Sequence, residues 1–285
     1  MKKILILSGK GGTGKTTIAS NFINISNARV FADCDVEAPN LHLVSKVKTL
    51  KNRGNYYGLD KVEIDQNICV SCGFCKEHCR FDAISIVNNQ YIVNKYLCEG
   101  CGVCEHICPV NAINFVKSKD GEINFYRTDK VFATAELNMG SGNSGLLVTK
   151  VKKKIQDEIL EDDLVIIDGP PGIGCPVIAS MSGVDLVLLV AEPSVSGISD
   201  LKRIIKTAYS FHLKIAVCVN KHDLNQKLTN QIIDYVKENN YDFVGKISYD
   251  KEIIHYVNKG ETLPNNSKSF KEIKNVFDNT LKIIT

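Results

Sequence analysis

Apolar and polar residues follow one another in blocks that predict buried strands, each with an amphipathic helix after it. The first block is the apolar run Ile4–Leu7, which ends in glycines and leads into an expected helix over about Lys15–Ser26. Near-continuous apolar strands that alternate with helices are typical of a mostly parallel sheet covered on both faces. The fold class expected from this pattern is α/β, with a doubly wound sheet.

Most of the remaining chain repeats this alternation. Further strands are expected at Val30–Ala32, Ile123–Tyr126, Val131–Ala135, Leu164–Ile167, Asp185–Val190, Ile215–Val219 and Phe243–Ile247. Further helices are expected near Ser144–Leu160, Cys175–Met181, Gly197–Tyr209, Asn225–Glu238 and Asp250–Asn258. The last segment, Lys268–Leu281, carries its apolar residues on one helical face. Such a stripe occurs on helices packed against a domain and on membrane-surface helices, and we expect a packed helix.

Between about Leu59 and Ser118 the alternation stops, and two similar segments occur there with an offset of 29 residues. The segment VEIDQNICVSCGFCKEHCRFDAISIV aligns without gaps with YIVNKYLCEGCGVCEHICPVNAINFV, which places Ala83 over Ala112. A duplicated unit of this kind is expected to form a small module of its own. We therefore expect one α/β domain, residues 1–58 and 119–285, interrupted by an inserted domain at residues 59–118.

Composition and charge exclude several classes of protein. The chain has 285 residues, of which 44% are hydrophobic and 24% charged, which excludes a collagen-like or largely disordered chain. A net charge of +3 from 35 basic and 32 acidic residues gives no nucleic-acid-binding footprint. The longest apolar stretch, Leu186–Ala191, is too short to span a membrane, and the N-terminus has no signal-peptide pattern. We expect a cytoplasmic protein with no nucleic-acid partner and no stable membrane insertion.

A glycine-rich segment directly after the first strand fits the P-loop pattern G-x-x-x-x-G-K-[ST], and the expected helix follows it. In this context backbone N–H groups surround phosphates, and the helix N-terminus favours their negative charge. Lys15 is expected to reach the β- and γ-phosphates, and the Thr16 hydroxyl to bind Mg²⁺. The residues expected to contact the nucleotide here are Gly9, Gly11, Gly12, Thr13, Gly14, Lys15, Thr16 and Thr17.

Carboxylates at the ends of two other expected strands complete the candidate site. Asp168 closes the strand Leu164–Ile167 and is followed by Gly-Pro-Pro-Gly. An apolar strand that ends in Asp beside a P-loop is the expected place for a second Mg²⁺ ligand. Asp33 and Asp35, at the end of the second strand, are candidates to position the attacking water.

The extra lysine inside the P-loop, Lys10 in the sequence KGGTGKT, resembles the deviant Walker A motif of the MinD/ParA/Mrp class, which includes the nitrogenase iron protein. The D-x-D segment up to Asn40 and the DGPPG segment resemble the two switch regions of that class. The resemblance implies a doubly wound parallel sheet and a homodimer with two ATP molecules at the interface. It also implies that Lys10 reaches the partner's bound phosphates, where added positive charge stabilises the transition state. By the same resemblance, Asp35 orients the hydrolytic water and Gly169–Gly172 sense the γ-phosphate.

A second short motif concerns the nucleotide base. The segment Val219-Asn-Lys-His-Asp223 matches N-K-x-D, which recognises guanine in GTPases. In the MinD-like class the Asn at this strand end, here Asn220, contacts adenine instead. We favour ATP and ADP as ligands, because the four-residue N-K-x-D match is weaker evidence for the base than the deviant Walker A type of the P-loop.

Eleven cysteines in a reducing compartment predict metal or redox chemistry in place of disulfides. Eight of them form two runs with the spacing x2-x2-x3 in the insert, which resemble the cluster-binding runs of two-cluster bacterial ferredoxins. In that arrangement the fourth cysteine of each run serves the other cluster. One [4Fe–4S] cluster is then expected on Cys69, Cys72, Cys75 and Cys108. The other is expected on Cys79, Cys98, Cys101 and Cys104.

Zinc is the alternative metal, but structural zinc sites usually pair two C-x2-C units across a longer loop. The resemblance to ferredoxins implies an α+β insert, with one departure: Arg80 stands where the second run has Pro109. Of the three remaining cysteines, Cys34 and Cys218 are expected to be buried. Cys175 is expected to be packed at a helix start and to bind no metal.

A P-loop ATPase of this class with such an insert resembles the MinD-superfamily ATPases that carry an inserted ferredoxin domain. The main hypothesis is ATP-gated electron transfer through the two clusters to a partner protein. The alternatives are an iron–sulfur carrier or assembly ATPase, and a positioning ATPase like MinD or ParA whose clusters are structural or sensory. The expected partner is an unidentified redox or iron–sulfur protein, or a second, paralogous ATPase.

Overall fold

The computed structural model describes residues 1–45, 47 and 50–284, and the chain divides into two compact units. Unit 1 comprises Met1–Arg53, Ile123–Glu136 and Gly145–Thr285. Unit 2 comprises Gly54–Glu122 and Leu137–Ser144, so a short segment after the duplicated region also belongs to it.

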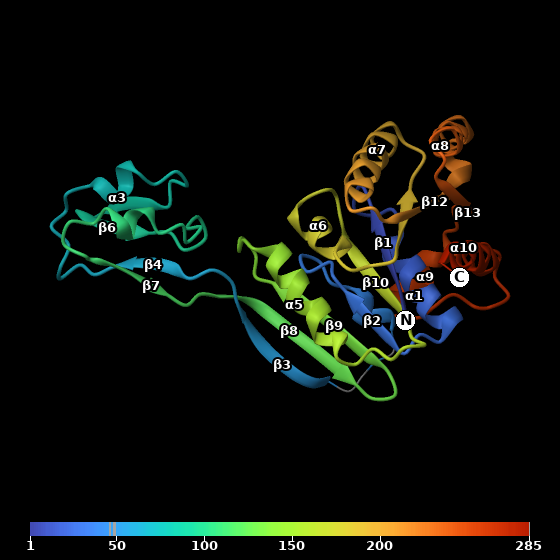
Figure 1. Cartoon of the computed structure of the whole chain (residues 1–285), viewed down its shortest axis with the longest axis horizontal. Coiled ribbons are helices and arrows are strands. Elements are labelled where there is room, and N and C mark those ends of the chain that lie inside the picture. Colours follow the sequence, from blue (N-terminus) through green and yellow to red (C-terminus); the bar gives the residue numbers. More distant parts are fainter. Residues whose placement is uncertain (46, 48–49, 285) are drawn as a thin grey trace. The chain divides into compact units, whose positions relative to one another are not determined.

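A nine-stranded sheet carries the functional residues of unit 1. Its strands are β1 (Lys2–Ser8), β2 (Val30–Asp33), β3 (Leu50–Tyr57), β8 (Lys119–Arg127), β9 (Val131–Leu137), β10 (Leu164–Pro171), β11 (Leu186–Ala191), β12 (Lys214–Asn220) and β13 (Asp242–Ile247). They are ordered β13-β12-β11-β1-β10-β2-β9-β8-β3 (Figure 1). The neighbours from β13 to β9 pair in parallel, which confirms the expected α/β fold with a mostly parallel sheet.

Helices cover both faces of this sheet. They are α1 (Lys15–Ser26), α2 (Leu41–Val44), α5 (Ser144–Gln156), α6 (Cys175–Met181), α7 (Val195–Ser210), α8 (Gln226–Glu238), α9 (Glu252–Asn258) and α10 (Lys268–Ile284), with a 3₁₀ turn at His222–Leu224. Side chains of β1 alternate between the faces: Ile4 and Ile6 belong to the core cluster that contains α1 and α10. Phe22 of α1 meets Phe277 of α10 edge to face at 4.9 Å, so the last helix is packed on the domain as expected.

The structure differs from the expected elements where the hydrophobic pattern is weak. Strand β3 was not expected, because its sequence is polar and seven of its eight residues are exposed. The short helix α2 was not expected either, since a single turn has no periodicity to detect. Strand β10 continues through Asp168 to Pro171, so part of the glycine-containing segment belongs to the carboxyl end of this strand, beside the P-loop.

Unit 2 consists of short antiparallel strand pairs and single-turn helices. Strand β4 (Lys61–Ile64) pairs with β7 (Ile113–Val116), and β5 (Ile84–Val87) pairs with β6 (Gln90–Val93). The two helices are α3 (Phe74–Glu77) and α4 (Val103–His106). This content is α+β, with no strand shared between the two small sheets.

The duplication in the sequence is also a duplication of backbone structure. The N–H of Asp65 donates to the carbonyl of Ala112 at 2.7 Å, and the N–H of Asn94 donates to the carbonyl of Ala83 at 2.7 Å. Asp65 corresponds to Asn94 in the repeat, and Ala83 corresponds to Ala112, each with an offset of 29 residues. Each repeat therefore donates the same hydrogen bond to the other repeat. Left-handed residues also recur with this offset, at Ser71 and Gly100, Gly73 and Gly102, and Asp82 and Asn111. The two halves of unit 2 therefore fold alike.

Candidate functional site

The P-loop connects β1 to α1 and leaves the start of that helix open. Gly14 is the N-cap residue, with a left-handed φ of 89° and no side-chain cap on the helix. A Cβ atom on Gly14 would lie 2.4 Å from Nδ2 of Asn220, so the close approach of the two segments requires glycine here. Uncapped N–H groups at a helix N-terminus favour a bound anion.

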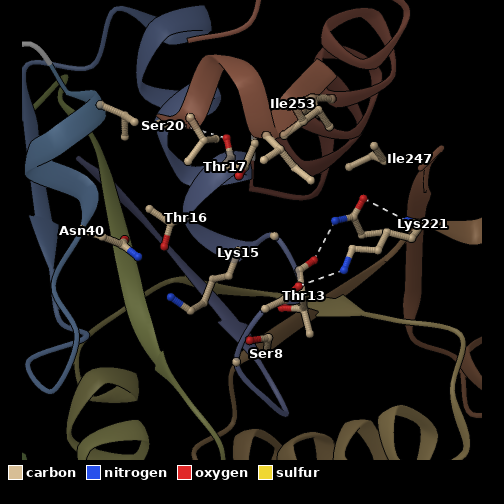
Figure 2. A pocket seen from close by; sticks show the side chains of 18 of the residues that line it. Ser8, Thr13, Lys15, Thr16, Thr17, Ser20, Asn40, Lys221, Ile247 and Ile253 are labelled. Atoms are coloured by element: carbon tan, nitrogen blue, oxygen red, sulfur yellow. Dashed lines mark hydrogen bonds between the residues drawn. The ribbon is translucent and has the colours of Figure 1, made fainter. Parts of the chain in front are cut away.

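A cavity of about 520 Å³ lies in front of this helix start (Figure 2). Its lining includes residues of the P-loop, of the segment after β2 and of the end of β12: Gly11, Gly12, Thr13, Gly14, Lys15, Thr16, Thr17, Asp35, Asn40, Asn220 and Lys221. The far wall contains apolar side chains, among them Ile247 from the end of β13 and Ile253 from α9, together with a few polar ones such as Asp250. A polar end for phosphates and an apolar end for a base fit a nucleotide. The apolar wall was not predicted, because helix α9 gives no chemical signal of its own.

Lys15 points into the cavity and is paired with two carboxylates. Its Nζ atom lies 2.8 Å from Oδ1 of Asp168 and 3.7 Å from Oδ2 of Asp35. Burial opposes the charge of Lys15, but the two carboxylates outweigh it and raise its pKa above the ordinary value. The P-loop lysine is thus kept charged next to the place where phosphates are expected.

The two predicted Mg²⁺ ligands are neighbours. The Thr16 hydroxyl donates to Oδ2 of Asp168 at 2.5 Å, and Asp168 is fully buried near the carboxyl end of the central strand β10. A hydroxyl and a carboxylate are hard oxygen donors, which is the type of ligand that Mg²⁺ prefers. Their contact fits a shared ion, with phosphate oxygens supplying further ligands.

Asp33 and Asp35 have different surroundings. The carboxylate of Asp33 accepts hydrogen bonds from the N–H groups of Asp35, Asn40 and Leu41, at 3.0, 3.0 and 2.9 Å. Burial and the charge of Asp168 raise the pKa of Asp33 to about 7, against the effect of these donors. Asp35 lines the cavity. Asp33 therefore holds the loop together, while Asp35 is exposed to the ligand space.

The glycine segment after Asp168 is joined to the start of the P-loop. The N–H of Gly172 donates to the carbonyl of Ser8 at 2.9 Å, and Gly172 has a left-handed φ of 90°. Gly172 does not line the cavity within the described part of the chain. Because the two segments share this bond, a movement of one changes the position of the other.

Asn220 and Lys221 hold the P-loop from the end of β12. Nδ2 of Asn220 donates to the carbonyl of Thr13 at 2.6 Å, and Nζ of Lys221 donates to the carbonyl of Gly12 at 2.9 Å. The carboxylate of Asp223, the last residue of the N-K-x-D match, accepts the N–H of Tyr249 at 2.7 Å. This bond is the main cause that lowers the pKa of Asp223. Among the described residues that line the cavity, Asp223 is absent.

Lys10 does not reach into this cavity. Its Nζ atom is 3.0 Å from Oε2 of Glu192, a residue that directly follows β11. Glu192 was not identified as a site residue from the sequence. The signal that points to it is topological, since β11 is the direct neighbour of β1 and its end lies beside the P-loop.

The eight cysteines of unit 2 line two cavities. One is lined by Cys69, Cys72, Cys75 and Cys108, and the other by Cys79, Cys98, Cys101 and Cys104. Thus the fourth cysteine of each run lies with the first three of the other run. The thiol of Cys108 accepts the N–H of Ala112 at 3.3 Å. Within the described residues, no three His, Cys, Asp or Glu side chains are close enough together to hold a single metal ion.

The three cysteines outside the insert lie in two kinds of environment. Cys34 and Cys218 are fully buried as expected, and burial raises the pKa of each thiol to about 12. The expectation that Cys175 is packed is wrong, because this residue is exposed at the start of α6. Its position in the first helical turn leaves the side chain outside the core.

Comparison with known proteins identifies the family. Residues 4–263 match the CobQ/CobB/MinD/ParA nucleotide binding domain, and the chain belongs to this family. It is 34% identical to an uncharacterised protein of Methanocaldococcus jannaschii over 286 residues, which covers 99% of this chain and 97% of the relative. It is 26% identical to the septum site-determining protein MinD of Bacillus subtilis over 275 residues, covering 93% and 83%.

A solved structure shows the same fold. The septum site-determining protein MinD of Pyrococcus horikoshii, complexed with Mg-ADP, matches with a TM-score of 0.58 at 18% identity, covering 99% of this chain and 97% of that one. Together with the family match, this makes the chain a P-loop ATPase of the MinD/ParA class. None of the described helices is both long and apolar enough to cross a membrane.

Proposed function

We propose that the chain is an ATP-driven switch that works as a homodimer and couples its nucleotide state to an iron–sulfur insert. The nucleotide part rests on the cavity in front of α1, which Lys15 and Thr16 line, and on the contacts of both residues with the buried carboxylate of Asp168. In this proposal Lys15 binds the β- and γ-phosphates, and Thr16 and Asp168 hold Mg²⁺. Asp35 orients the attacking water, and Lys10 of one chain adds positive charge at the phosphates of the other.

The nucleotide is proposed to be ATP. In GTPases the Asp of N-K-x-D must face the base, but here the Asp223 carboxylate is used by the backbone of Tyr249 and lies outside the cavity lining. The wall around Ile247 and Ile253 also contains Asp250, but both of its carboxylate oxygens already accept hydrogen bonds, from the N–H of Glu252 and the hydroxyl of Ser269. The apolar side chains of this wall fit an adenine ring. Asn220 supports the base site by fixing the P-loop carbonyl of Thr13.

The insert is proposed to hold two [4Fe–4S] clusters. The observation that carries this proposal is that each of the two cavities is lined by four cysteines, three from one run and the fourth from the other. A cluster binds each thiolate to a different iron, so its four ligands stand farther apart than those of a single ion. The N–H donor on the Cys108 thiol is a further favourable feature, because hydrogen bonds to ligand sulfur tune cluster potential. Such clusters supply one-electron transfer when they are bound.

Paired cysteine variants test the crossed ligand sets. After anaerobic reconstitution, wild type should hold about eight irons per chain. A Cys69→Ser/Cys108→Ser variant removes two ligands of one cluster and should retain about four irons. A Cys69→Ser/Cys79→Ser variant removes one ligand from each cluster and should retain far fewer. Cys175→Ser is the control and should behave as wild type; equal iron contents in the two double variants would contradict the proposal.

ATP-gated electron transfer to a partner is the proposed role of this combination. It is supported by the position of the insert in the sequence, between the Asp33–Asn40 segment and Asp168, whose contacts a γ-phosphate can change. An anaerobic pull-down with the ATP-locked variant Asp35→Ala should isolate the partner. The partner should then be reduced faster with ATP than with ADP, and a Lys15→Ala variant should lose this difference. Equal rates in all three cases would sink the gating role.

A positioning ATPase is the second candidate, and the likeness to MinD of Bacillus subtilis favours it. In this case the clusters would be structural or sensory. Co-sedimentation with liposomes and with DNA, each with ATP and with ADP, separates the two candidates, since only a positioning ATPase should bind in an ATP-dependent way. A cluster carrier would instead lose its iron to an apo-protein acceptor during the same ATP incubation.

A further inference from the structure

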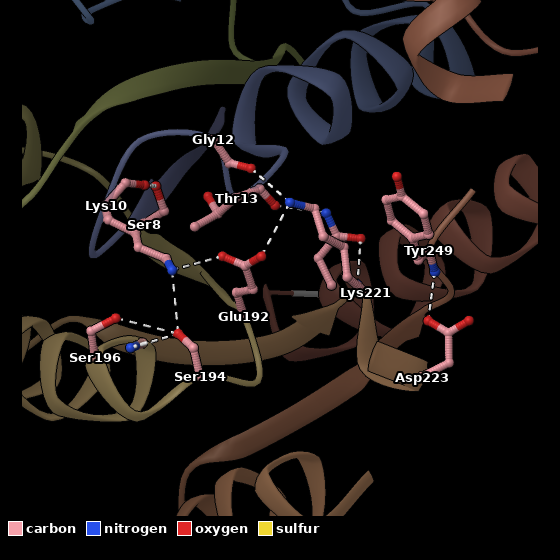
Figure 3. A network of polar contacts seen from close by, with 12 residues as sticks. Ser8, Lys10, Gly12, Thr13, Glu192, Ser194, Ser196, Lys221, Asp223 and Tyr249 are labelled. Atoms are coloured by element: carbon pink, nitrogen blue, oxygen red, sulfur yellow. Dashed lines mark hydrogen bonds and ion pairs between the residues drawn. The ribbon is translucent and has the colours of Figure 1, made fainter. Parts of the chain in front are cut away.

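The amino group of Lys10 is held inside its own chain. Its Nζ atom forms an ion pair with Oε2 of Glu192 at 3.0 Å and donates to the Oγ atom of Ser194 at 3.3 Å. Figure 3 shows the Lys10 side chain directed toward these two residues. The start of the P-loop is thereby joined to the loop between β11 and α7.

Glu192 is fixed in place from two further directions. Its other oxygen, Oε1, lies 3.2 Å from Nζ of Lys221, which also donates to the P-loop carbonyl of Gly12 (Figure 3). Its backbone carbonyl accepts the N–H of Ser194 at 2.7 Å, and a Cβ atom on Gly197 would lie only 2.4 Å from it. The hydrogen bonds from Lys10 and Lys221 hold the pKa of Glu192 below its usual range despite burial. The Glu192 carboxylate is therefore held in place as a negatively charged partner for Lys10.

This contact conflicts with the role that the proposed function gives to Lys10. One amino group cannot bind Glu192 of its own chain and the phosphates of the partner at the same time. We infer that Glu192 is a positioning residue which retains Lys10 in the single chain and releases it when the dimer forms. This inference rests on the proposed function, because it presupposes that Lys10 acts on the partner's nucleotide.

Lys221 makes the release feasible. When Lys10 leaves, Glu192 keeps Lys221 as its counter-ion, so this half-buried carboxylate is not left without a positive partner. Lys221 also lines the nucleotide cavity beside Asn220. The ion-pair network thus connects the base end of the cavity to Lys10 through one carboxylate.

Retention of Lys10 should raise the protein concentration needed for hydrolysis. If only the released form can complete a dimer, the apparent affinity falls by the fraction of chains in that form. A symmetric dimer needs a released Lys10 in both chains, so the apparent affinity of dimerisation falls with the square of the released fraction. An ion pair of this exposure is expected to change the population a few-fold per chain, and hence the midpoint concentration about tenfold.

ATPase rates measured over a range of protein concentrations test this inference. Glu192→Gln keeps the shape of the side chain and removes its charge. It should lower the protein concentration at half-maximal rate about tenfold. The KM for ATP and the maximal rate at high protein concentration should stay within about twofold. Higher salt should bring wild type closer to the variant, since screening weakens the ion pair that only wild type has.

Two control variants make the result specific. Glu238→Gln removes one negative charge from the exposed end of α8 and should leave the concentration dependence unchanged. A Lys10→Ala/Glu192→Gln double variant should hydrolyse ATP no faster than Lys10→Ala alone at any protein concentration, because the effect of Glu192 acts through Lys10.

The possible failures are distinct. If Lys10→Ala alone hydrolyses ATP like wild type at every concentration, the in-trans role of Lys10 in the proposed function is wrong. If Lys10→Ala is inactive but Glu192→Gln has an unchanged or higher midpoint, the retention of Lys10 by Glu192 is overturned while the proposed function stands. A lower maximal rate for Glu192→Gln would also overturn it, since that result places Glu192 in the active dimer.

Discussion

Two carboxylates that are two residues apart in the sequence have different tasks in the structure. Asp33 accepts three backbone N–H groups and is fully buried, so it fixes the loop that leads into α2. Asp35 has its carboxylate on the cavity side, near Lys15. The D-x-D motif made both of them candidates for positioning water, and only the hydrogen bonds distinguish a loop-fixing residue from a ligand-facing one.

Matched Asp→Asn variants should separate these tasks. Asp33→Asn replaces one of the two accepting oxygens by an NH2 group, which cannot accept hydrogen bonds from the backbone N–H groups. This change should lower the free energy of unfolding by about 1–3 kcal/mol. Asp35→Asn should leave stability nearly unchanged and lower kcat about 100-fold or more, because an amide cannot take a proton from the attacking water. Denaturant unfolding and single-turnover ATP hydrolysis check the two effects. A loss of stability with Asp35→Asn and none with Asp33→Asn would reverse the assignment.

The sequence predicted site residues that belong to a motif and missed those defined by their neighbours in space. Lys15, Thr16 and Asp168 were expected together because a P-loop and a strand-end carboxylate have a known relation, and the structure brings them into contact. Glu192 belongs to no motif that names its role. Its importance comes from the pairing of β1 with β11, which joins residues more than 180 positions apart.

At the scale of elements, α5 and α6 are connected through one lysine. Lys152 of α5 donates to the carbonyls of Ala179, Ser180 and Ser182, where α6 ends and its carbonyls have no helical partners. Burial lowers the pKa of Lys152 to about 8. The helix that follows the glycine segment of the site is thus held at its far end by a partly buried lysine.

The stability of this contact should depend on pH with a defined sign. In the unfolded chain a lysine has a pKa of about 10.4, whereas folded Lys152 has about 8. Below pH 8 both states hold the proton and the full penalty of burying the charge applies. Between about pH 8 and 10 the folded chain releases the proton first, so the free energy of unfolding rises with pH. A Lys152→Met variant lacks this increase.

Thermal unfolding at pH 7.5, 8.5 and 9.5 checks the sign. The Tm of wild type minus that of Lys152→Met should increase across this series. Lys153→Met, which removes an exposed lysine of the same helix, is the matched control and should show no such trend. A constant difference for Lys152→Met would mean that the folded pKa is not lowered.

Elements with strong periodicity were predictable, and those held by distant partners were not. The start of α1 at Lys15 and the bounds of α6 agree with expectation because glycines or a proline mark them. Strand β3 is polar and depends on pairing at the edge of the sheet, which no local pattern records. For the same reason the sequence did not show that Leu137–Ser144 joins the compact unit formed by Gly54–Glu122.

At the scale of the whole molecule, charge is distributed unevenly between the parts of the sequence. The chain has a net charge of +3, but residues 60–118 contain seven Asp and Glu against five Lys and Arg. Each oxidised [4Fe–4S] core with four thiolates would add a charge of about −2 to this segment.

Anion-exchange chromatography at pH 7 should resolve this difference. The apo chain is net positive and should pass through the column, whereas the reconstituted chain should be retained because its insert becomes a dense anionic surface. The Cys69→Ser/Cys108→Ser variant, which can hold only one cluster, should elute between the two. The order of elution is the decisive result, because it reports the number of bound clusters through their negative charge and does not depend on their absorbance. Identical elution of all three forms would mean that the insert gains no charge, and a partner with a basic docking face would then have nothing to recognise.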